Sequence, residues 1–399
     1  MFGMTTATQA TRRSTPQGHY DAGIIIAAIA LASLGTIMVA SSSISVADSQ
    51  QTGPFHYLIR HLVFLAFGCA LALAAARIEL AWIERHASKL LLLAFLLLVL
   101  VFAPVIGMRV NGAQRWLHFG ISGFQPVEAV KLILIAYLAS YLVRHRDSVH
   151  ASMIGVLKPL GIALGLVCLL LLQPDFGSAM LLMVVALGMI WLGGARLRNL
   201  AVLSALATPC IAWAAIFEEY RFKRLKTFLD PWADPFNDGF QLTQALIAIG
   251  RGEWFGVGLG ASVQKLFYLP EAHTDFILAV IAEELGFAGI LLVLALFAWL
   301  VGRGFRIGLR AVECGQRFAG YCAFGVSLLI AVQALVSIGV NLGVLPTKGL
   351  TLPLISSGGS SVLMTCLAIG VLVRASYELS RAENAAAQAV HADPEAVAT

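Results

Sequence analysis

The stretch EAHTDFILAVIAEELG (residues 271–286) opens an apolar run that continues to about residue 302. About 20 apolar residues are enough for a helix to cross the hydrocarbon core of a bilayer. The first turns of this run nevertheless hold acids, among them Asp275, Glu283 and Glu284. Charged groups in a membrane span are costly unless they face protein, water or a partner. The stretch therefore predicts a membrane helix whose acids have a structural or functional role.

The composition of the whole chain agrees with a membrane protein. The 399 residues are 59% hydrophobic and only 12% charged, with a mean hydropathy of +0.84, which is far more apolar than a soluble domain requires. The runs are too long and too continuous for the alternating strands of a barrel. The sequence predicts an all-α polytopic membrane protein with about ten transmembrane helices. The predicted spans are 22–44, 57–76, 88–107, 125–143, 156–173, 177–194, 197–217, 274–302, 318–344 and 350–374.

The distribution of Lys and Arg predicts the orientation. With the N-terminus inside, sixteen of the 27 lie in cytoplasmic segments and five in short outer segments and adjoining helix ends, which is the bias that sets topology. We therefore expect a cytoplasmic segment 1–21, a transmembrane domain 22–375 and a cytoplasmic tail 376–399. The net charge of +5 mostly reflects this inner-face bias, so no nucleic-acid partner is expected.

A long segment, residues 218–272, is predicted to be a large outer loop between the seventh and eighth helices. At about 55 residues it is too long for a simple connector. DPWADPFNDGF (230–240) is rich in turn-forming residues. GFQLTQALIAIGRGEWFGVGLG (239–260) combines a short amphipathic segment with glycines. The loop is therefore expected to contain a re-entrant or interfacial element on the outer leaflet.

Asp275 lies where the eighth helix is predicted to begin. One interpretation makes Asp275 or Thr274 a helix N-cap, and the other places a functional carboxylate at the outer surface. Glu283 and Glu284 point to different faces of the helix. A paired structural contact is the favoured interpretation for each of these two glutamates.

Three further polar clusters lie at the outer side of predicted helices. Glu128 and Lys131 are three residues apart and so share a helix face; they either neutralise each other or line a cavity. Arg115 and Trp116 are an interfacial anchor or a headgroup contact. Asp175 lies in a turn between two helices, and Lys348 precedes a Pro-, Ser- and Gly-rich stretch at membrane depth. Because irregular backbone is tolerated there only against protein or a cavity, we predict one polar chamber that opens outward.

Four segments resemble the signature segments of the SEDS family (shape, elongation, division and sporulation). The segments are NGAQRWLHFGISGFQPVEAVKL (111–132), QPDFGSAMLL (173–182), LPEAHTDFILAVIAEELGFAG (269–289) and PTKGLTLPLISSGGSS (346–361). They occur in the family's order through nearly the whole membrane region. The segment 250–276 resembles the division-type branch of the family more than the elongation-type branch.

The resemblance implies a peptidoglycan glycosyltransferase that polymerises lipid II outside the bacterial inner membrane, at the division septum. Asp275 matches the family's essential catalytic acid, and Glu128 and Lys131 match its SE-x-x-K pair, with Val127 in place of the usual small polar residue. Asp175 and Lys348 match the aspartate and lysine of two further motifs. The expected partners are a class B penicillin-binding protein of the FtsI type and membrane proteins of the FtsQ, FtsL, FtsB and FtsN types.

The predicted chemistry requires a base and a group that receives negative charge. Asp275 could accept the proton of the acceptor's sugar hydroxyl. Lys131, Arg115 or a divalent cation such as Mg or Mn could stabilise the departing pyrophosphate. No cofactor is otherwise expected. A lipid II flippase, an elongation-type polymerase and a scaffold for division proteins are the alternatives.

Overall fold

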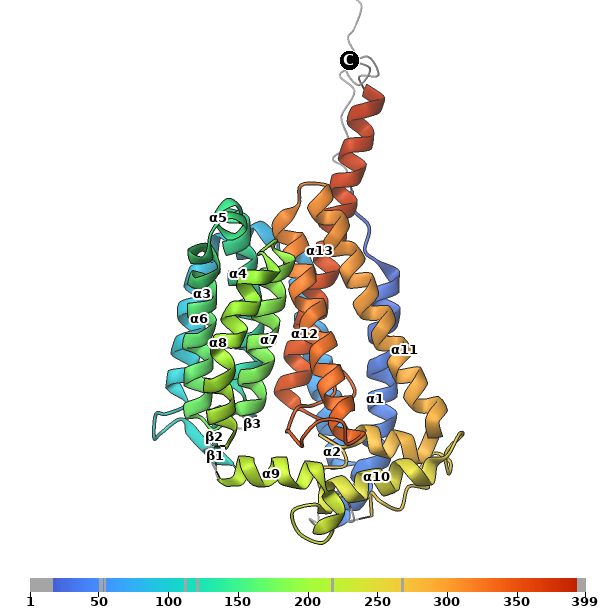
Figure 1. Ribbon diagram of the computed structural model, residues 1–399. Coiled ribbons are helices and arrows are strands. Elements are labelled where there is room, and N and C mark those ends of the chain that lie inside the picture. The colour runs from blue at the N-terminus through green and yellow to red at the C-terminus, as the bar shows by residue number, and fades with distance from the viewer. Residues whose placement is uncertain are drawn as a thin grey trace, which may run out of the picture.

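The computed structural model describes residues 17–49, 53, 55–110, 113–119, 122–216, 219–266 and 269–392. These residues form a bundle of long helices with one small sheet (Figure 1). Residues 1–16 and 393–399 of the predicted terminal segments lie outside the described part. The long helices are α1 (Ala22–Ser49), α2 (His56–Arg77), α3 (Leu80–Leu100), α4 (Pro126–Arg144), α6 (Met153–Leu172), α7 (Phe176–Leu192), α8 (Leu197–Ile216), α11 (Ile277–Glu313), α12 (Arg317–Asn341) and α13 (Gly359–Ala392).

The helices confirm the all-α polytopic fold class. Among the described residues, seven helices are long and apolar enough to cross a membrane, namely α1, α2, α4, α6, α11, α12 and α13. Helix α7 and the start of α8 form shorter apolar helices, and α3 packs on α4 in the same bundle. Large apolar side chains such as Leu92 (72% exposed) and Phe67 (64%) cover the outside, where lipid would contact them. The chain is an integral membrane protein.

Two predicted spans were misplaced. The third was expected at 88–107, but α3 begins at Leu80 and ends at Leu100. Its first turns hold Glu84, Arg85 and Lys89, which do not interrupt the helix because they lie near the bundle end. The tenth was expected at 350–374, but residues 350–358 are irregular, and the helix then continues through most of the segment predicted as a tail, to Ala392.

A small antiparallel sheet lies between α3 and α4, and the sequence did not predict it. Strands β1 (Gly107–Val110), β2 (Ala113–Phe119) and β3 (Ser122–Phe124) pair in the order β1-β2-β3. Gly107 faces Leu117 in one pair, and Leu117 faces Phe124 in the other. The sheet sits at the same end of the bundle as α9 and α10 (Figure 1); we call this end the loop end.

The predicted outer loop is largely structured. It contains α9 (Glu219–Leu229), the short helix η1 (Pro231–Ala233) and α10 (Phe240–Gly252). Helices α9 and α10 lie across the loop end, and α9 runs from the side of α8 toward the side of α10 (Figure 1). Helix α10 buries Leu242, Ala245 and Ala248 and packs on α11. The expected short amphipathic element is therefore present.

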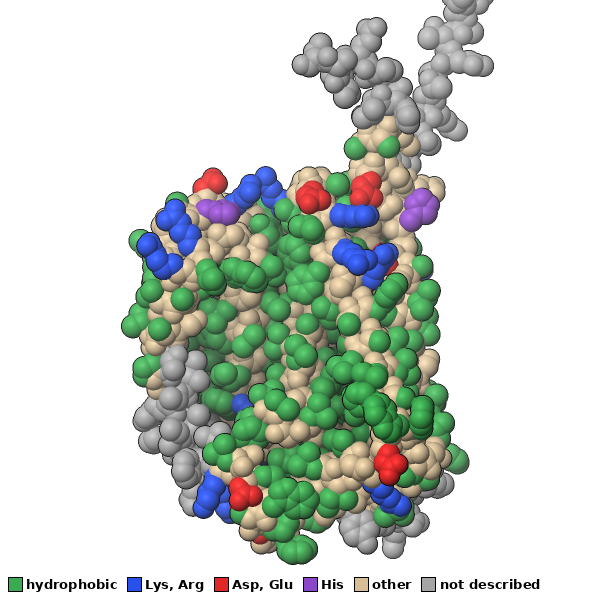
Figure 2. Space-filling model, turned by 45° about the vertical axis from the view of Figure 1, so that its right-hand side comes forward, with side chains coloured by type: hydrophobic (Ala, Val, Ile, Leu, Met, Phe, Trp, Pro, Cys, Tyr) green, Lys and Arg blue, Asp and Glu red, His purple; other side chains and the backbone are tan. Residues whose placement is uncertain are grey.

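Both described terminal segments lie at the opposite end of the bundle, which we call the terminal end (Figure 1). The N–H of His19 donates to Ser380 Oγ over 3.1 Å, and the guanidinium of Arg303 pairs with Asp21. Figure 2 shows Lys and Arg side chains gathered at this end, above a belt of hydrophobic side chains. The two terminal segments thus share one side of the membrane region, as the orientation prediction requires.

Candidate active site

Asp275 lies in the turn that precedes α11, at the loop end. Asn341, the last residue of α12, holds this turn: its Nδ2 donates to the Asp275 carbonyl over 2.9 Å, and its Oδ1 accepts from the Ala279 N–H over 3.1 Å. The N-cap position belongs to Phe276, without a side-chain cap, and Thr274 Oγ1 donates back to Glu271. The alternative that Asp275 or Thr274 caps the helix is therefore wrong, and the Asp275 carboxylate is left for another role.

The carboxylate of Asp275 points toward Gly349. A Cβ built on Gly349 would lie 3.2 Å from Asp275 Oδ2, so a side chain there would crowd the acid. Within the described part of the chain, no donor hydrogen-bonds to this carboxylate. The pKa of Asp275 is raised to about 7, chiefly by burial and also by the nearby Glu271, while Arg224 of α9 opposes the shift. A carboxylate with a pKa near the ambient pH is suited to accept a proton.

The irregular segment 342–358 connects Asp275 to the other polar clusters. Besides Gly349, the segment includes Ser356, whose Oγ donates to the Thr274 carbonyl over 2.6 Å, and Ser357, whose N–H donates to the His273 carbonyl over 2.9 Å. The prediction of irregular backbone after Lys348 is confirmed. The turn before α11 thus supplies an acceptor for one backbone N–H of the segment, and packing against protein explains why the irregular backbone is tolerated.

Lys348 of the irregular segment lies beside the first residues of α7. Its Nζ is 3.9 Å from the centre of the Phe176 ring, and its Cβ is 3.8 Å from the position of a Cβ on Gly177. Asp175 caps the same helix by accepting the Ser178 N–H over 3.1 Å. The expectation that Asp175 occupies a capped turn is confirmed, and the structure adds Lys348 to it.

Arg115 on β2 holds the turn before α7. Its Nε donates to the Gln173 carbonyl over 3.2 Å, its guanidinium also donates to the Pro174 carbonyl, and its Nη1 is 3.9 Å from Asp175 Oδ1. Trp116 packs on Gly123 of the same sheet. Arg115, Asp175 and Lys348 thus form one group, which residue 349 links to Asp275.

Glu128 and Lys131 form an ion pair on one face of α4, as their spacing predicted. Lys131 Nζ is 2.8 Å from Glu128 Oε1 and 3.1 Å from Gln333 Oε1 of α12. Gln333 in turn donates to the Thr351 carbonyl over 3.0 Å, which joins the pair to the segment after Lys348. The side chains are 10% and 2% exposed. Mutual neutralisation is confirmed, and contact with substrate stays a prediction.

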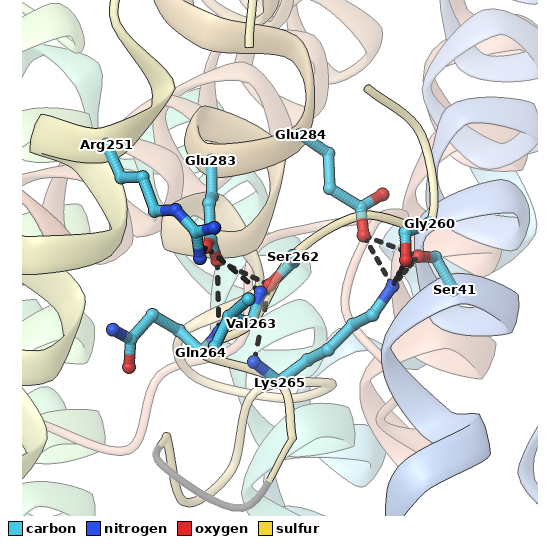
Figure 3. Close-up of polar contacts among 9 residues, drawn as sticks. All are labelled: Ser41, Arg251, Gly260, Ser262, Val263, Gln264, Lys265, Glu283 and Glu284. Atoms are coloured by element: carbon cyan, nitrogen blue, oxygen red, sulfur yellow. Dashed lines mark hydrogen bonds and ion pairs between the residues drawn. The ribbon is translucent and has the colours of Figure 1, made fainter. Parts of the chain in front are cut away.

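Glu283 and Glu284 are fully buried, and each has partners (Figure 3). Glu283 accepts from Arg251 Nη1 over 3.1 Å and from the Val263 N–H over 3.0 Å. Glu284 accepts from Lys265 Nζ over 2.7 Å. The preferred interpretation of both glutamates as paired structural contacts is confirmed.

Sequence reasoning missed the residues that organise the turn around Asp275. Asn341 and Gln333 are polar residues within an apolar helix, and polar groups at membrane depth are a signal that could have identified them. Arg224 and Gly349 gave no comparable signal, because their importance depends on contacts between segments far apart in the chain.

No group of three or more His, Cys, Asp or Glu side chains that could hold a metal ion occurs among the described residues. Glu271 and Asp275 lie close enough for the charge of one to raise the pKa of the other. Mg²⁺ commonly binds through one or two carboxylates together with substrate phosphates. The described residues of the site therefore offer a pair of carboxylates but no complete set of protein ligands for such an ion.

Comparison with known proteins finds a matching family and relatives that bear the name of one of its members. Residues 21–381 match the family of FtsW, RodA and SpoVE, described as cell cycle proteins. The chain is 58% identical over 375 residues to a probable peptidoglycan glycosyltransferase FtsW of Xanthomonas oryzae, covering 94% of this chain and 76% of the relative. It is 50% identical over 367 residues to the protein of the same name from Coxiella burnetii, covering 92% and 99%.

Solved structures show the same fold. A chain of a peptidoglycan synthase complex, described as coordinating polymerization and crosslinking, superposes with a TM-score of 0.74 at 29% identity, over 90% of this chain and 98% of that one. The rod shape determining protein RodA of Thermus thermophilus superposes with a TM-score of 0.65 at 27% identity, over 90% and 96%. The match to the family model and the identity to division-type relatives confirm the resemblance inferred from the motifs. This chain belongs to the FtsW/RodA/SpoVE family of cell cycle proteins.

Proposed function

We propose that this protein is a division-type peptidoglycan glycosyltransferase that polymerises lipid II, with Asp275 as general base. The observation that supports the role of Asp275 is its carboxylate, which has a pKa raised to about 7 and accepts no hydrogen bond within the described residues. The names of the relatives support the activity.

In the proposed reaction, the hydroxyl oxygen of the acceptor sugar attacks the anomeric carbon of the donor chain. The bond from that carbon to the pyrophosphate oxygen breaks, and its electron pair leaves with undecaprenyl pyrophosphate. Asp275 accepts the hydroxyl proton. A single displacement converts the α-linked donor to a β linkage, so a second carboxylate nucleophile is unnecessary.

The leaving pyrophosphate requires cations close to the base. Arg115, Trp116, Asp175 and Lys348 form the proposed wall of the substrate site, with Lys348 and Arg115 as the pyrophosphate contacts. In this proposal Glu128 and Lys131 support that wall through Gln333. A divalent cation such as Mg or Mn, bound to the pyrophosphate, would supply further positive charge.

The proposed setting is the division septum, with the loop end facing the periplasm and both termini in the cytoplasm. The sixteen-to-five distribution of Lys and Arg supports this orientation. The synthase complex among the structural relatives supports a partner that crosslinks, which we identify as a class B penicillin-binding protein of the FtsI type. Partners of the FtsQ, FtsL, FtsB and FtsN types belong to the same proposal.

Labelling with a membrane-impermeant thiol reagent tests the orientation. A cysteine introduced at Asn237, between η1 and α10, should react when only the outer face of the inner membrane is accessible. Reaction only after the inner membrane is permeabilised would reverse the topology and remove the outward-facing site.

A lipid II flippase is the second candidate, because α11 is interrupted at Gly286 and discontinuous helices are frequent in transporters. Purified full-length protein incubated with lipid II in detergent, alone and with its partner, separates the two, since flipping has no meaning without a bilayer. Glycan polymer is the expected product. Absence of polymer in both samples, together with lipid II translocation in vesicles, would favour the flippase.

A further inference from the structure

Helix α11 consists of two helical segments that meet at Gly286. The backbone of Gly286 has φ 69° and ψ −163°, which is not helical. The first segment, residues 277–285, begins two residues after Asp275. Its position therefore determines where the carboxylate of Asp275 lies, and that position depends on what contacts the segment at the break.

The backbone of the preceding loop completes the hydrogen bonds of the break. The N–H groups of Val257 and Gly258 donate to the carbonyls of Glu283 and Glu284 over 2.9 and 3.1 Å. In the other direction, the N–H groups of residues 287 and 288 donate to the carbonyls of residues 253 and 254, over 2.9 and 3.1 Å. The loop thus replaces the helical partners that Gly286 removes.

Glycine is required on both sides of this contact. A Cβ on Gly286 would lie 2.4 Å from the Gly256 nitrogen, and a Cβ on Gly256, which has φ +80°, would lie 2.1 Å from the Glu284 oxygen. A Cβ on Gly252 would lie 1.8 Å from the Ala282 oxygen. The loop and the first segment of α11 are therefore in direct backbone contact.

Lys265 joins three separate parts of the chain at this place (Figure 3). Its Nζ donates to Glu284 Oε1 over 2.7 Å, to Ser41 Oγ of α1 over 2.8 Å and to the Gly260 carbonyl over 2.8 Å. Ser41 also donates to Glu284 Oε1 over 2.7 Å. We call Ser41, Lys265 and Glu284 the Lys265 cluster. Because the Lys265 side chain is 9% exposed and that of Glu284 0%, water cannot replace these partners.

We propose that Lys265 and Glu284 are positioning residues for Asp275: they hold the first segment of α11 between α1 and the loop, and so place the carboxylate. This inference rests on the proposed function. Glu284 is nine residues beyond Asp275, about 13 Å along a helix, so neither residue of the pair reaches the reacting atoms. Their effect is on the rate of the chemical step and not on substrate binding.

Loss of the Lys265 cation should displace the segment. Removing one partner of a buried pair leaves an uncompensated charge, and Glu284 would then have to move toward water. A misplacement of about 1 Å at a reacting group can cost about 100-fold in rate. The pair differs in this respect from Lys223 and Asp238, an ion pair of the same loop whose side chains are 61% and 36% exposed.

The test uses the full-length protein with its partner and compares Lys265→Met, Lys265→Arg and the matched control Lys223→Met. We expect Lys265→Met to lower kcat for lipid II polymerisation at least tenfold, with KM within about twofold of wild type. Lys265→Arg should recover most of the rate, and Lys223→Met should match wild type. Wild-type kcat for Lys265→Met, or an equal loss for Lys223→Met, would overturn the proposal.

Hydrogen–deuterium exchange of the same samples measures directly how well the first segment of α11 is held. Amides of residues 277–285 should exchange faster in Lys265→Met, while those of α4 stay unchanged. Faster exchange without loss of kcat would overturn the positioning role. An active Asp275→Asn variant would refute the proposed role of Asp275 as the base. Because hydrogen–deuterium exchange does not depend on which residue is the base, it would still test whether the Lys265 cluster holds residues 277–285.

A double variant covers the case in which Lys265→Met is not recovered in folded form. Lys265→Met combined with Glu284→Gln removes both charges and leaves neither buried and unpaired. Positioning by the ion pair predicts at least a fivefold loss of kcat and faster exchange of residues 277–285 in this variant. A double variant with wild-type values of both would refute it.

Discussion

Two carboxylates of the same helix region, Glu283 and Asp275, have opposite surroundings. Glu283 is fully buried and accepts from Arg251, Ser262 and two backbone N–H groups. The carboxylate of Asp275 accepts no hydrogen bond within the described residues, and its pKa is raised to about 7. An acid that stabilises the fold is saturated with donors, whereas an acid that takes up protons is left without them. The contrast separates a structural from a catalytic carboxylate where the sequence shows only two acids near one helix end.

The largest effect should come from Asp275→Asn. Asparagine keeps the size of the side chain and removes its basicity, so polymerisation of lipid II should fall by about 100-fold or more. Thermal unfolding and partner binding should stay at wild-type values, because the side chain makes no hydrogen bond that holds the fold. A near-wild-type rate would show that another residue is the base and that Asp275 does not differ from Glu283 in having a catalytic role.

Glu283→Ala should act on stability instead. The substitution leaves three donors without an acceptor: the buried Ser262 hydroxyl and Gln264 N–H, and the partly buried N–H of Val263. We expect a loss of about 2 kcal/mol or more, measured as a lower midpoint of thermal unfolding in detergent. The Arg251 ion pair adds little to this figure, because the Arg251 side chain is 44% exposed. An unchanged midpoint would show that saturation by donors does not mark a structural acid.

Exchanging the charges of Glu128 and Lys131 should have a smaller effect. The variant Glu128→Lys with Lys131→Glu keeps a neutral pair on one helix face but changes what contacts Gln333. We expect folded protein with polymerisation reduced about tenfold, because the wall of the substrate site is altered. Full activity in the exchanged variant would show that the pair of Glu128 and Lys131 acts only by neutralising its own charges.

The smallest effect concerns pH. A base must be deprotonated, so the rate should fall as the pH falls through about 7, the raised pKa of Asp275. Glu271→Gln removes a like charge that raises this pKa, so the acid limb should move to lower pH. Rates of the wild type and of Glu271→Gln between about pH 5.5 and about 8.5 measure the acid limb of each. An unshifted limb would show that Glu271 does not act on the base.

Prediction from sequence succeeded where the pattern that identifies a feature lies within one segment of the chain. Apolar run length identified the helices, and an i,i+3 spacing identified the pair of Glu128 and Lys131. The strands were missed because β1 and β3 have only four and three residues, and β2 (AQRWLHF) does not alternate strictly between polar and apolar residues. The break at Gly286 was missed because an isolated glycine is tolerated in an apolar helix, and its cause is a loop about 30 residues earlier in the chain.

The candidate site shows the same limit. The motif match predicted Asp275, Asp175 and Lys348, but not that residue 349 joins them. Asn341 holds the Asp275 turn from a position 66 residues away. Contacts of this kind depend on tertiary packing, which a local pattern does not encode.

The break in α11 also bears on how the chain is made. The carbonyls of Glu283 and Glu284 find their partners in residues 257 and 258, which leave the ribosome earlier. The acceptor groups are thus synthesised only after their donors are available, and the break can close as soon as the helix enters the bilayer. Segment 252–288 is in this sense one unit of biogenesis. A chimera that exchanges only the loop or only the first half of α11 should keep the break when glycine stays at 252, 256 and 286, because a Cβ at any of these positions would collide with the backbone of the other half.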